Sequence, residues 1–98
     1  MSYKISGQAI KDIENIWLYT VEHWSVEQAD RYYNLIFEEI EYITNHFESG
    51  KDISSVRKGY RYSKVKSHLI FYRKSKSGVV EIIRVLHERM DVENRLND

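Results

Sequence analysis

Residues 68–73 (HLIFYR) and 79–87 (VVEIIRVLH) decide the fold. Both stretches are dense in β-branched and aromatic residues, which favour strands, and residues 74–78 (KSKSG) between them include a glycine suited to a short loop. In the second stretch apolar side chains occur on both faces, as expected of a strand inside a sheet and not at its edge. We therefore predict an antiparallel hairpin at the centre of the fold.

A further strand is predicted immediately before this hairpin. Residues 59–65 alternate aromatic with polar side chains, and Lys66-Ser67 can turn this strand directly into the next one. Residues 51–58 are polar and are expected to form a loop. The sheet then has at least three antiparallel strands, to which residues 3–5 could add a short one.

Two helices are predicted in the first half of the chain. Apolar residues recur at helical spacing over about residues 8–23, after a possible cap at Ser6-Gly7. Ser25 and Gln28 form a capping box, from which a second helix runs for about six turns to a left-handed cap at Gly50. Because the turn between the helices is short, they should form an antiparallel helix hairpin.

Length and composition bound the class of protein. The 98 residues are expected to form a single domain over 1–98, and 42% hydrophobic residues argue against disorder. Cysteine is absent, which excludes disulfides and thiolate metal sites, and the four histidines lack metal-ligand spacing. We expect no metal, no cofactor and no membrane segment, and therefore a cytoplasmic location.

The formal net charge of zero hides a strong asymmetry along the chain. Residues 1–50 hold three basic side chains against nine acidic ones, whereas residues 51–76 hold nine basic side chains against Asp52 alone. Residues 77–98 hold three basic and five acidic side chains. Such a distribution gives a folded protein a polar field that steers partners, unless the basic residues are simply solvated turn and strand positions.

Several single residues leave two interpretations open. Arg84 is either a buried or half-buried partner of a glutamate from the helix hairpin or a contact held ready for a target. His87 is either a hydrogen-bonding lock between strand and tail or a proton shuttle, and strand alternation places it with Ile83 and Val85, opposite Arg84. For Trp17 and Trp24 we expect packing in the core in preference to a binding surface. Residues 91–96 form either a short helix capped by Asp91 or a mobile tail.

The joint order of these segments resembles the ParE toxins of the RelE/ParE superfamily. The likeness spans nearly the whole chain and rests on residues 16–20 (IWLYT), 24–29 (WSVEQA), 59–61 (GYR), 68–73 (HLIFYR) and 82–91 (IIRVLHERMD). The resemblance implies an α+β fold, with the N-terminal antiparallel helix hairpin packed on a small twisted antiparallel β-sheet. It also implies a toxin of a type II toxin-antitoxin system that poisons DNA gyrase by binding, without enzymatic activity.

The resemblance further implies a ParD-like antitoxin in a hetero-oligomeric complex, and no direct sequence-specific binding of nucleic acid. We expect the antitoxin to contact outward-facing helix residues and basic strand residues, with Tyr19, Arg61 and Arg73 as candidates. For the target we expect the stretch from His87 to the C-terminus beside the arginine-bearing strand end. The candidate target contacts are Arg84, His87, Arg89 and Met90.

Two alternatives stay open. RelE-like relatives are ribosome-dependent mRNA endoribonucleases, whose chemistry needs a base, an acid and a cation at the phosphate. Arg61, Arg73 or Arg84 could supply the cation, and His87 or Glu81 the base or acid. The usual C-terminal aromatic of such enzymes has no counterpart here, because no Phe, Tyr or Trp follows position 72. The other alternative is an inactive relative that binds an antitoxin only.

Overall fold

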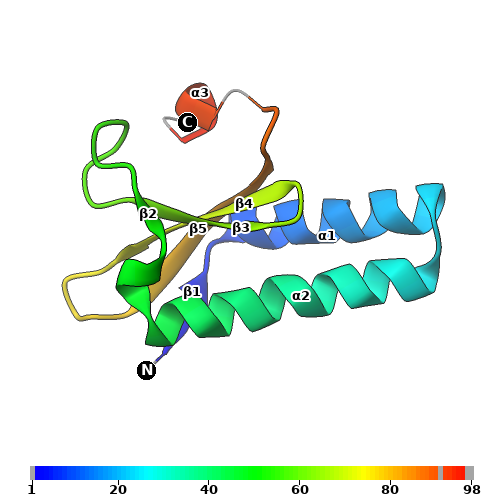
Figure 1. Cartoon of the computed structure of the whole chain (residues 1–98), viewed down its shortest axis with the longest axis horizontal. Helices are drawn as coiled ribbons and strands as arrows, with labels where there is room; N and C mark the ends of the chain where they lie inside the picture. Colours follow the sequence, from blue (N-terminus) through cyan, green and yellow to red (C-terminus); the bar gives the residue numbers. More distant parts are fainter. Residues whose placement is uncertain (1, 91, 97–98) are drawn as a thin grey trace.

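The computed structural model describes residues 2–90 and 92–96 and shows a helix hairpin on one face of a sheet with a short helix on the other (Figure 1). The elements are β1 (Tyr3–Ile5), α1 (Gly7–His23), α2 (Val26–Asn45), a 3-10 turn (Phe47–Ser49), β2 (Lys51–Asp52), β3 (Arg61–Val65), β4 (His68–Lys74), β5 (Val80–His87) and α3 (Val92–Leu96). The predicted α+β architecture is thereby confirmed. No helix within the described residues is long and apolar enough to cross a membrane.

The sheet has five strands in the order β1-β5-β4-β3-β2. Three neighbouring pairs are antiparallel, and β5 lies inside the sheet as its two apolar faces predict. Two details differ from the expectation. β1 pairs parallel to β5, which a strand can do when a long crossover separates it from its partner, and Lys51-Asp52 forms a short edge strand where a loop was predicted.

Both helix starts follow the predicted capping chemistry. The Ser6 hydroxyl accepts the N–H of Ala9 at 3.0 Å, and the Ser25 hydroxyl accepts the N–H of Gln28 at 3.1 Å. The C-terminal prediction for α2 is wrong, because α2 ends at Asn45 and Gly50 has an extended backbone with φ of −76°.

A glycine is needed at position 50 because a side chain there would collide with the sheet, and not because the backbone is left-handed. A Cβ atom added there would lie 2.8 Å from the Tyr72 ring carbon Cζ and 2.9 Å from the Tyr62 carbonyl oxygen. The Tyr72 hydroxyl passes this point and donates a hydrogen bond to the Phe47 carbonyl at 2.8 Å. The glycine therefore lets the 3-10 turn approach the sheet closely.

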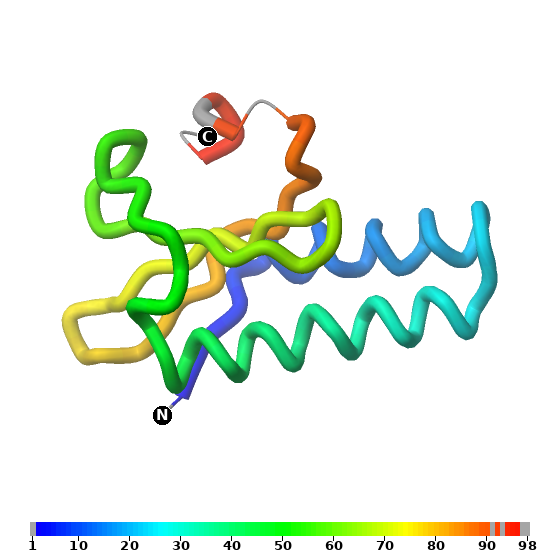
Figure 2. The backbone as a smooth tube through the Cα atoms, viewed as in Figure 1, coloured from blue at the N-terminus to red at the C-terminus, as the bar shows by residue number. Residues whose placement is uncertain are grey.

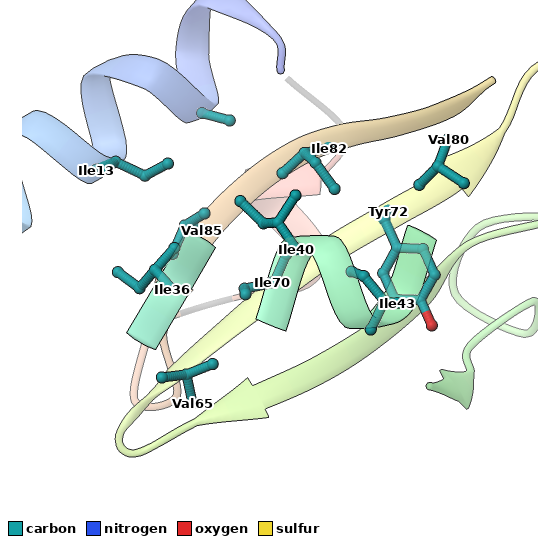
Figure 3. Packing of buried hydrophobic residues seen from close by; sticks show 11 residues of the cluster. Ile13, Ile36, Ile40, Ile43, Val65, Ile70, Tyr72, Val80, Ile82 and Val85 are labelled. Carbon is teal, nitrogen blue, oxygen red and sulfur yellow. The ribbon is translucent and has the colours of Figure 1, made fainter. Parts of the chain in front are cut away.

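The main core lies between the helix hairpin and the sheet. Figure 3 shows aliphatic side chains of α1 and α2 directed at the side chains of β3, β4 and β5. The members labelled there are Ile13, Ile36, Ile40, Ile43, Val65, Ile70, Tyr72, Val80, Ile82 and Val85. A second cluster, formed by Tyr60, Phe71, Leu86 and Leu96, covers the other face of the sheet beneath α3. Of the two alternatives for the C-terminal stretch, the short helix is thus present over Val92–Leu96, whereas its expected cap Asp91 lies outside the described residues.

A bulge in β5 changes which side chains share a face. Phe71 pairs with Arg84, but the next residue, Tyr72, pairs with Ile82, so that Ile83 is the extra residue. Ile83 consequently packs with the second cluster, whereas Val85 belongs to the main core. The strict alternation expected for β5 is therefore wrong at this point. Beyond the bulge, His87 faces His68 in register.

Candidate functional site

An open groove of about 1000 Å³ lies between the helix hairpin and the end of the sheet at the β3–β4 turn. It is lined by α1, α2, the turn at Lys66-Ser67 and the chain just after β5. Its rim is apolar, since Trp24, Tyr19 and Met90 have exposed fractions of 74%, 60% and 44%. Exposed apolar side chains gathered around a concave surface are typical of a binding site for another macromolecule.

The exposure of Trp24 contradicts the prediction that both tryptophans pack in the core. α1 ends at His23, and Trp24 has a non-helical backbone with φ of −135° and ψ of −90°. Its side chain therefore leaves the core-facing stripe that helical spacing assigns to it. Trp17 is partly buried, and its indole N–H donates to Asp30 of α2 at 2.9 Å.

The polar part of the groove is built from Tyr32, His68 and His87. The Tyr32 hydroxyl donates to the Val65 carbonyl at 2.9 Å and lies 2.6 Å from Nδ1 of His68. Because a hydroxyl has one proton to donate, His68 Nδ1–H donates to the Tyr32 oxygen, which leaves His68 Nε2 unprotonated. The rings of His68 and His87 meet edge to face, with centroids 5.3 Å apart.

Burial sets the protonation of this group. The pKa of His68 falls to about 4, first because burial penalises its charged form and then because His87 adds a neighbouring positive charge. Burial likewise raises the pKa of the Tyr32 hydroxyl. His68 is therefore neutral near pH 7. His87 Nδ1 accepts the backbone N–H of Arg89 at 3.1 Å. His87 therefore makes the hydrogen bond between strand and tail that the first of its two interpretations expects.

The strand arginines are engaged by groups of the chain itself. Arg84 forms a two-point ion pair with Asp12 of α1, with Nε–Oδ2 at 2.8 Å and Nη2–Oδ1 at 3.0 Å. The expected partner from the helix hairpin is thus present, as an aspartate and not a glutamate. Asp12 also accepts the Val85 N–H at 3.0 Å, beyond the point where β1 stops pairing with β5. Arg73 pairs with Glu81 at 2.8 Å.

The structure groups the predicted site residues differently from the sequence analysis. Tyr19, predicted for the antitoxin, lines the same groove as His87 and Met90, predicted for the target. Arg89 follows His87 and is exposed. The remaining three candidates lie elsewhere: Arg84 is bonded to α1, while Arg61 and Arg73 are at the opposite end of the sheet.

Trp24, Tyr32 and His68 are among the groove residues that sequence reasoning does not identify. The facing of His68 and His87 depends on the bulge, because counting back from the Lys74–Val80 pair without it places His68 opposite Leu86. In the sequence, Tyr32 is one of the residues that recur at helical spacing along α2, and nothing in that pattern indicates a polar role for its hydroxyl. A usable signal was the position of Trp24 just before the helix cap at Ser25, outside both helices.

Comparison with known proteins places this fold among the toxins of type II toxin-antitoxin systems. Residues 3–92 match the family described as ParE toxin of type II toxin-antitoxin system, parDE. The chain is 41% identical over 95 residues to Toxin ParE1 of Caulobacter vibrioides, and 35% identical over 94 residues to Toxin ParE1 of Mycobacterium tuberculosis, with 96% of each chain covered in both cases. The chain therefore belongs to the ParE toxin family.

The fold is also shared with a solved structure titled chromosomal ParDE TA system from P. aeruginosa. The TM-score is 0.76 at 21% sequence identity, with 89% of this chain and 95% of that chain covered. At this level of identity the likeness establishes a common fold. Membership of the family implies an antitoxin as partner.

Proposed function

We propose that this chain arrests growth by poisoning DNA gyrase in the cytoplasm, through a binding surface and without catalysis. The match of residues 3–92 to the ParE toxin family carries the proposal. A poison of this kind stabilises a cleaved DNA intermediate, so it needs a surface complementary to its target enzyme. The groove provides such a surface, and we assign target contact to His87, Arg89 and Met90 at its C-terminal side.

The state of the strand arginines supports a binding role over RNA cleavage. Cleavage needs a base, an acid and a free cation at one phosphate. Glu81 is paired with Arg73 near the start of β5, whereas His87 lies at its end, and Arg84 is held by Asp12. The groups named for that chemistry are thus separated along the strand and engaged by other partners.

A ParD-like antitoxin is proposed to neutralise the toxin by filling the groove. The exposed rings of Tyr19 and Trp24 suit the apolar face of an amphipathic helix, which is a common occupant of such grooves. A helix placed there covers His87 and Met90 and so blocks the proposed target contact. To reach Arg61 and Arg73 as well, the antitoxin must follow much of the 39 Å length of the molecule, which takes about 12 extended residues.

The test runs two assays on the purified protein in parallel. One measures cleaved DNA in a gyrase supercoiling reaction, and the other maps cuts in a reporter mRNA during translation. We expect cleaved DNA to accumulate while the mRNA stays intact. Cut mRNA with unaffected gyrase would contradict the proposal and assign ribonuclease activity. A protein that binds its antitoxin but has neither effect would be the inactive relative.

A variant pair locates the contact. Met90→Asp should weaken gyrase poisoning at least about tenfold, because it places a charge on the apolar rim. Leu18→Asp is the matched control, since Leu18 has an exposed fraction of 51% against 44% for Met90 and lies outside the groove. Equal activity of both variants would remove Met90 from the target contact.

A further inference from the structure

The basic side chains of the middle of the sequence gather at one end of the folded molecule. We call this the basic end and define it by residues 51–61 and 73–79. The first segment holds four basic side chains and one acidic one, Asp52. The second holds three basic side chains and no acidic one. Figure 2 shows the green loop of the first segment and the yellow turn of the second at the same end of the molecule, away from the helix hairpin turn.

Two aromatic rings bring cations of the two segments together. The guanidinium groups of Arg57 and Arg73 lie 5.6 and 5.7 Å from the centroid of the Tyr60 ring. The Phe47 ring has the Arg61 guanidinium at 5.5 Å and the Lys74 ammonium at 4.4 Å from its centroid. Like charges are therefore concentrated where the two segments meet, and a bound polyanion would relieve their mutual repulsion.

Part of this charge is compensated within the protein and part is not. Arg73 pairs with Glu81 at 2.8 Å, and Arg61 donates to the Gly50 carbonyl at 2.8 Å. Among the described side chains, those of residues 2–90, 92 and 94–96, by contrast, no acidic group forms an ion pair with the lysines of the basic end. These lysines are Lys51, Lys58, Lys74 and Lys76.

The basic end also lacks the apolar centre of a protein docking surface. In the described part of the chain, every strongly exposed large hydrophobic side chain lies at positions 10–42 or at Met90, outside both segments. Protein interfaces have an apolar core, whereas interfaces with nucleic acid are polar and strongly positive. The serines of the turn, Ser75 and Ser77, are small polar groups of the kind that contact phosphate oxygens.

We propose that the basic end binds the phosphodiester backbone of a nucleic acid duplex without reading its sequence. Lys51, Arg57, Lys58, Lys74 and Lys76 are the phosphate contacts. The cross-section of the molecule at this end is at most 29 × 22 Å, so the site covers no more than about 8 base pairs at 3.4 Å each. The surface is separate from the groove and does not require gyrase to be the target.

The test is the salt dependence of binding to a fluorescent duplex of about 20 base pairs, with DNA and RNA duplexes in separate arms. Five phosphate contacts predict a slope of about −4.5 for log K against log salt. In the double variant Lys74→Gln, Lys76→Gln the slope should fall to about −2.7, with affinity at 0.1 M salt reduced by at least about tenfold. The control is the double variant Lys11→Gln, Lys66→Gln, which removes the same charge outside the basic end. Its salt slope and its affinity for the duplex should equal those of the wild type.

The arms separate the sources of the phosphate. Tighter binding of the DNA duplex assigns the surface to DNA, and tighter binding of the RNA duplex assigns it to RNA. A wild-type slope near zero, or equal losses in the two double variants, would overturn the proposal. Binding of polyglutamate but of neither duplex would also overturn it and assign the basic end to an acidic protein segment. Because no gyrase is present, these outcomes do not depend on the proposed function.

Discussion

Two ion pairs of equal length have different roles because they are buried to different extents. Arg84–Asp12 and Arg73–Glu81 both have an Nε–O distance of 2.8 Å. The side chains of the first pair have exposed fractions of 12% and 14%, whereas those of the second have 44% and 30%. Removing one partner of a buried pair leaves the other charge without solvent or partner, while water solvates the partner left by an exposed pair.

We therefore predict that Arg84→Met lowers the free energy of unfolding by about 3 kcal/mol. The substitution roughly keeps the length of the side chain. It leaves the Asp12 carboxylate with the hydrogen bond from the Val85 N–H but without the guanidinium. Arg73→Met is the control and should cost less than about 1 kcal/mol. Urea unfolding followed by circular dichroism measures both, and equal losses would contradict the burial argument.

At the scale of elements, α2, β4 and β5 meet where His68 contacts both Tyr32 and His87. The groups that act on His68 there also include Asp12 and Glu88, whose negative charges favour its protonation. Burial and the charge of His87 act in the opposite direction and dominate, so the folded protein holds His68 with a pKa of about 4. The unfolded chain has the ordinary histidine pKa of about 6.5.

This difference predicts a loss of stability in mild acid. The folded pKa is lowered, so between about pH 6.5 and 4 the unfolded state binds the proton and the folded state does not. This contribution to the free energy of unfolding is fully present above pH 6.5. By pH 4.5 the free energy of unfolding should have fallen by about 1 to 2 kcal/mol, a figure that allows for the partial exposure of the ring. Urea midpoints at pH 7 and pH 4.5 measure it for the wild type.

Two asparagine variants isolate this contribution. His68→Asn keeps an N–H close to the Tyr32 oxygen but cannot titrate, so its decline between the two pH values should be smaller than that of the wild type. His23→Asn changes an exposed histidine of α1 and should keep the full decline. An unchanged decline in His68→Asn would show that other groups cause it.

The elements show how far sequence patterns determine the fold. Helical and strand periodicity located α1, α2, β3, β4 and β5, because each places an apolar face against the core at regular spacing. The bulge at Ile83 and the close approach at Gly50 depend on how distant segments pack, and local patterns do not contain that information.

The candidate site was less predictable than the fold for the same reason. His87 and Met90 were singled out from the sequence, and so was Tyr19, but their common groove arises only when α1 packs beside the end of β5. Helical spacing places Trp24 in the core. It is exposed because α1 ends at His23, the residue before it, so that Trp24 does not continue the helical stripe.

At the scale of the whole molecule, the apolar groove and the basic end lie at opposite ends of the sheet. β3 begins at the basic end with Arg61 and ends beside the groove at Val65, and β4 returns to the basic end. One partner that fills the groove and another that contacts the basic end can therefore bind together. An antitoxin confined to the groove would leave the basic end accessible.

Occupation of the groove gives a prediction for antitoxin binding. Trp24→Ala should weaken the affinity for a ParD-like antitoxin at least about tenfold, because a large exposed ring is typical of the residues that dominate binding energy. Tyr33→Ala removes an exposed ring outside the groove and should leave the affinity unchanged. Isothermal titration calorimetry measures both, and an unchanged affinity for Trp24→Ala would place the antitoxin elsewhere.

The edges of the sheet are its shortest strands, since β1 has three residues and β2 has two. Long open edges allow copies of a protein to join their sheets into aggregates, and short edges that carry lysine prevent this. Lys4 and Lys51 occupy these two strands, and Asp12 binds the Val85 N–H of β5 beyond the end of β1. Toxin released from its partner therefore offers little template for strand-to-strand polymerisation, even when it accumulates.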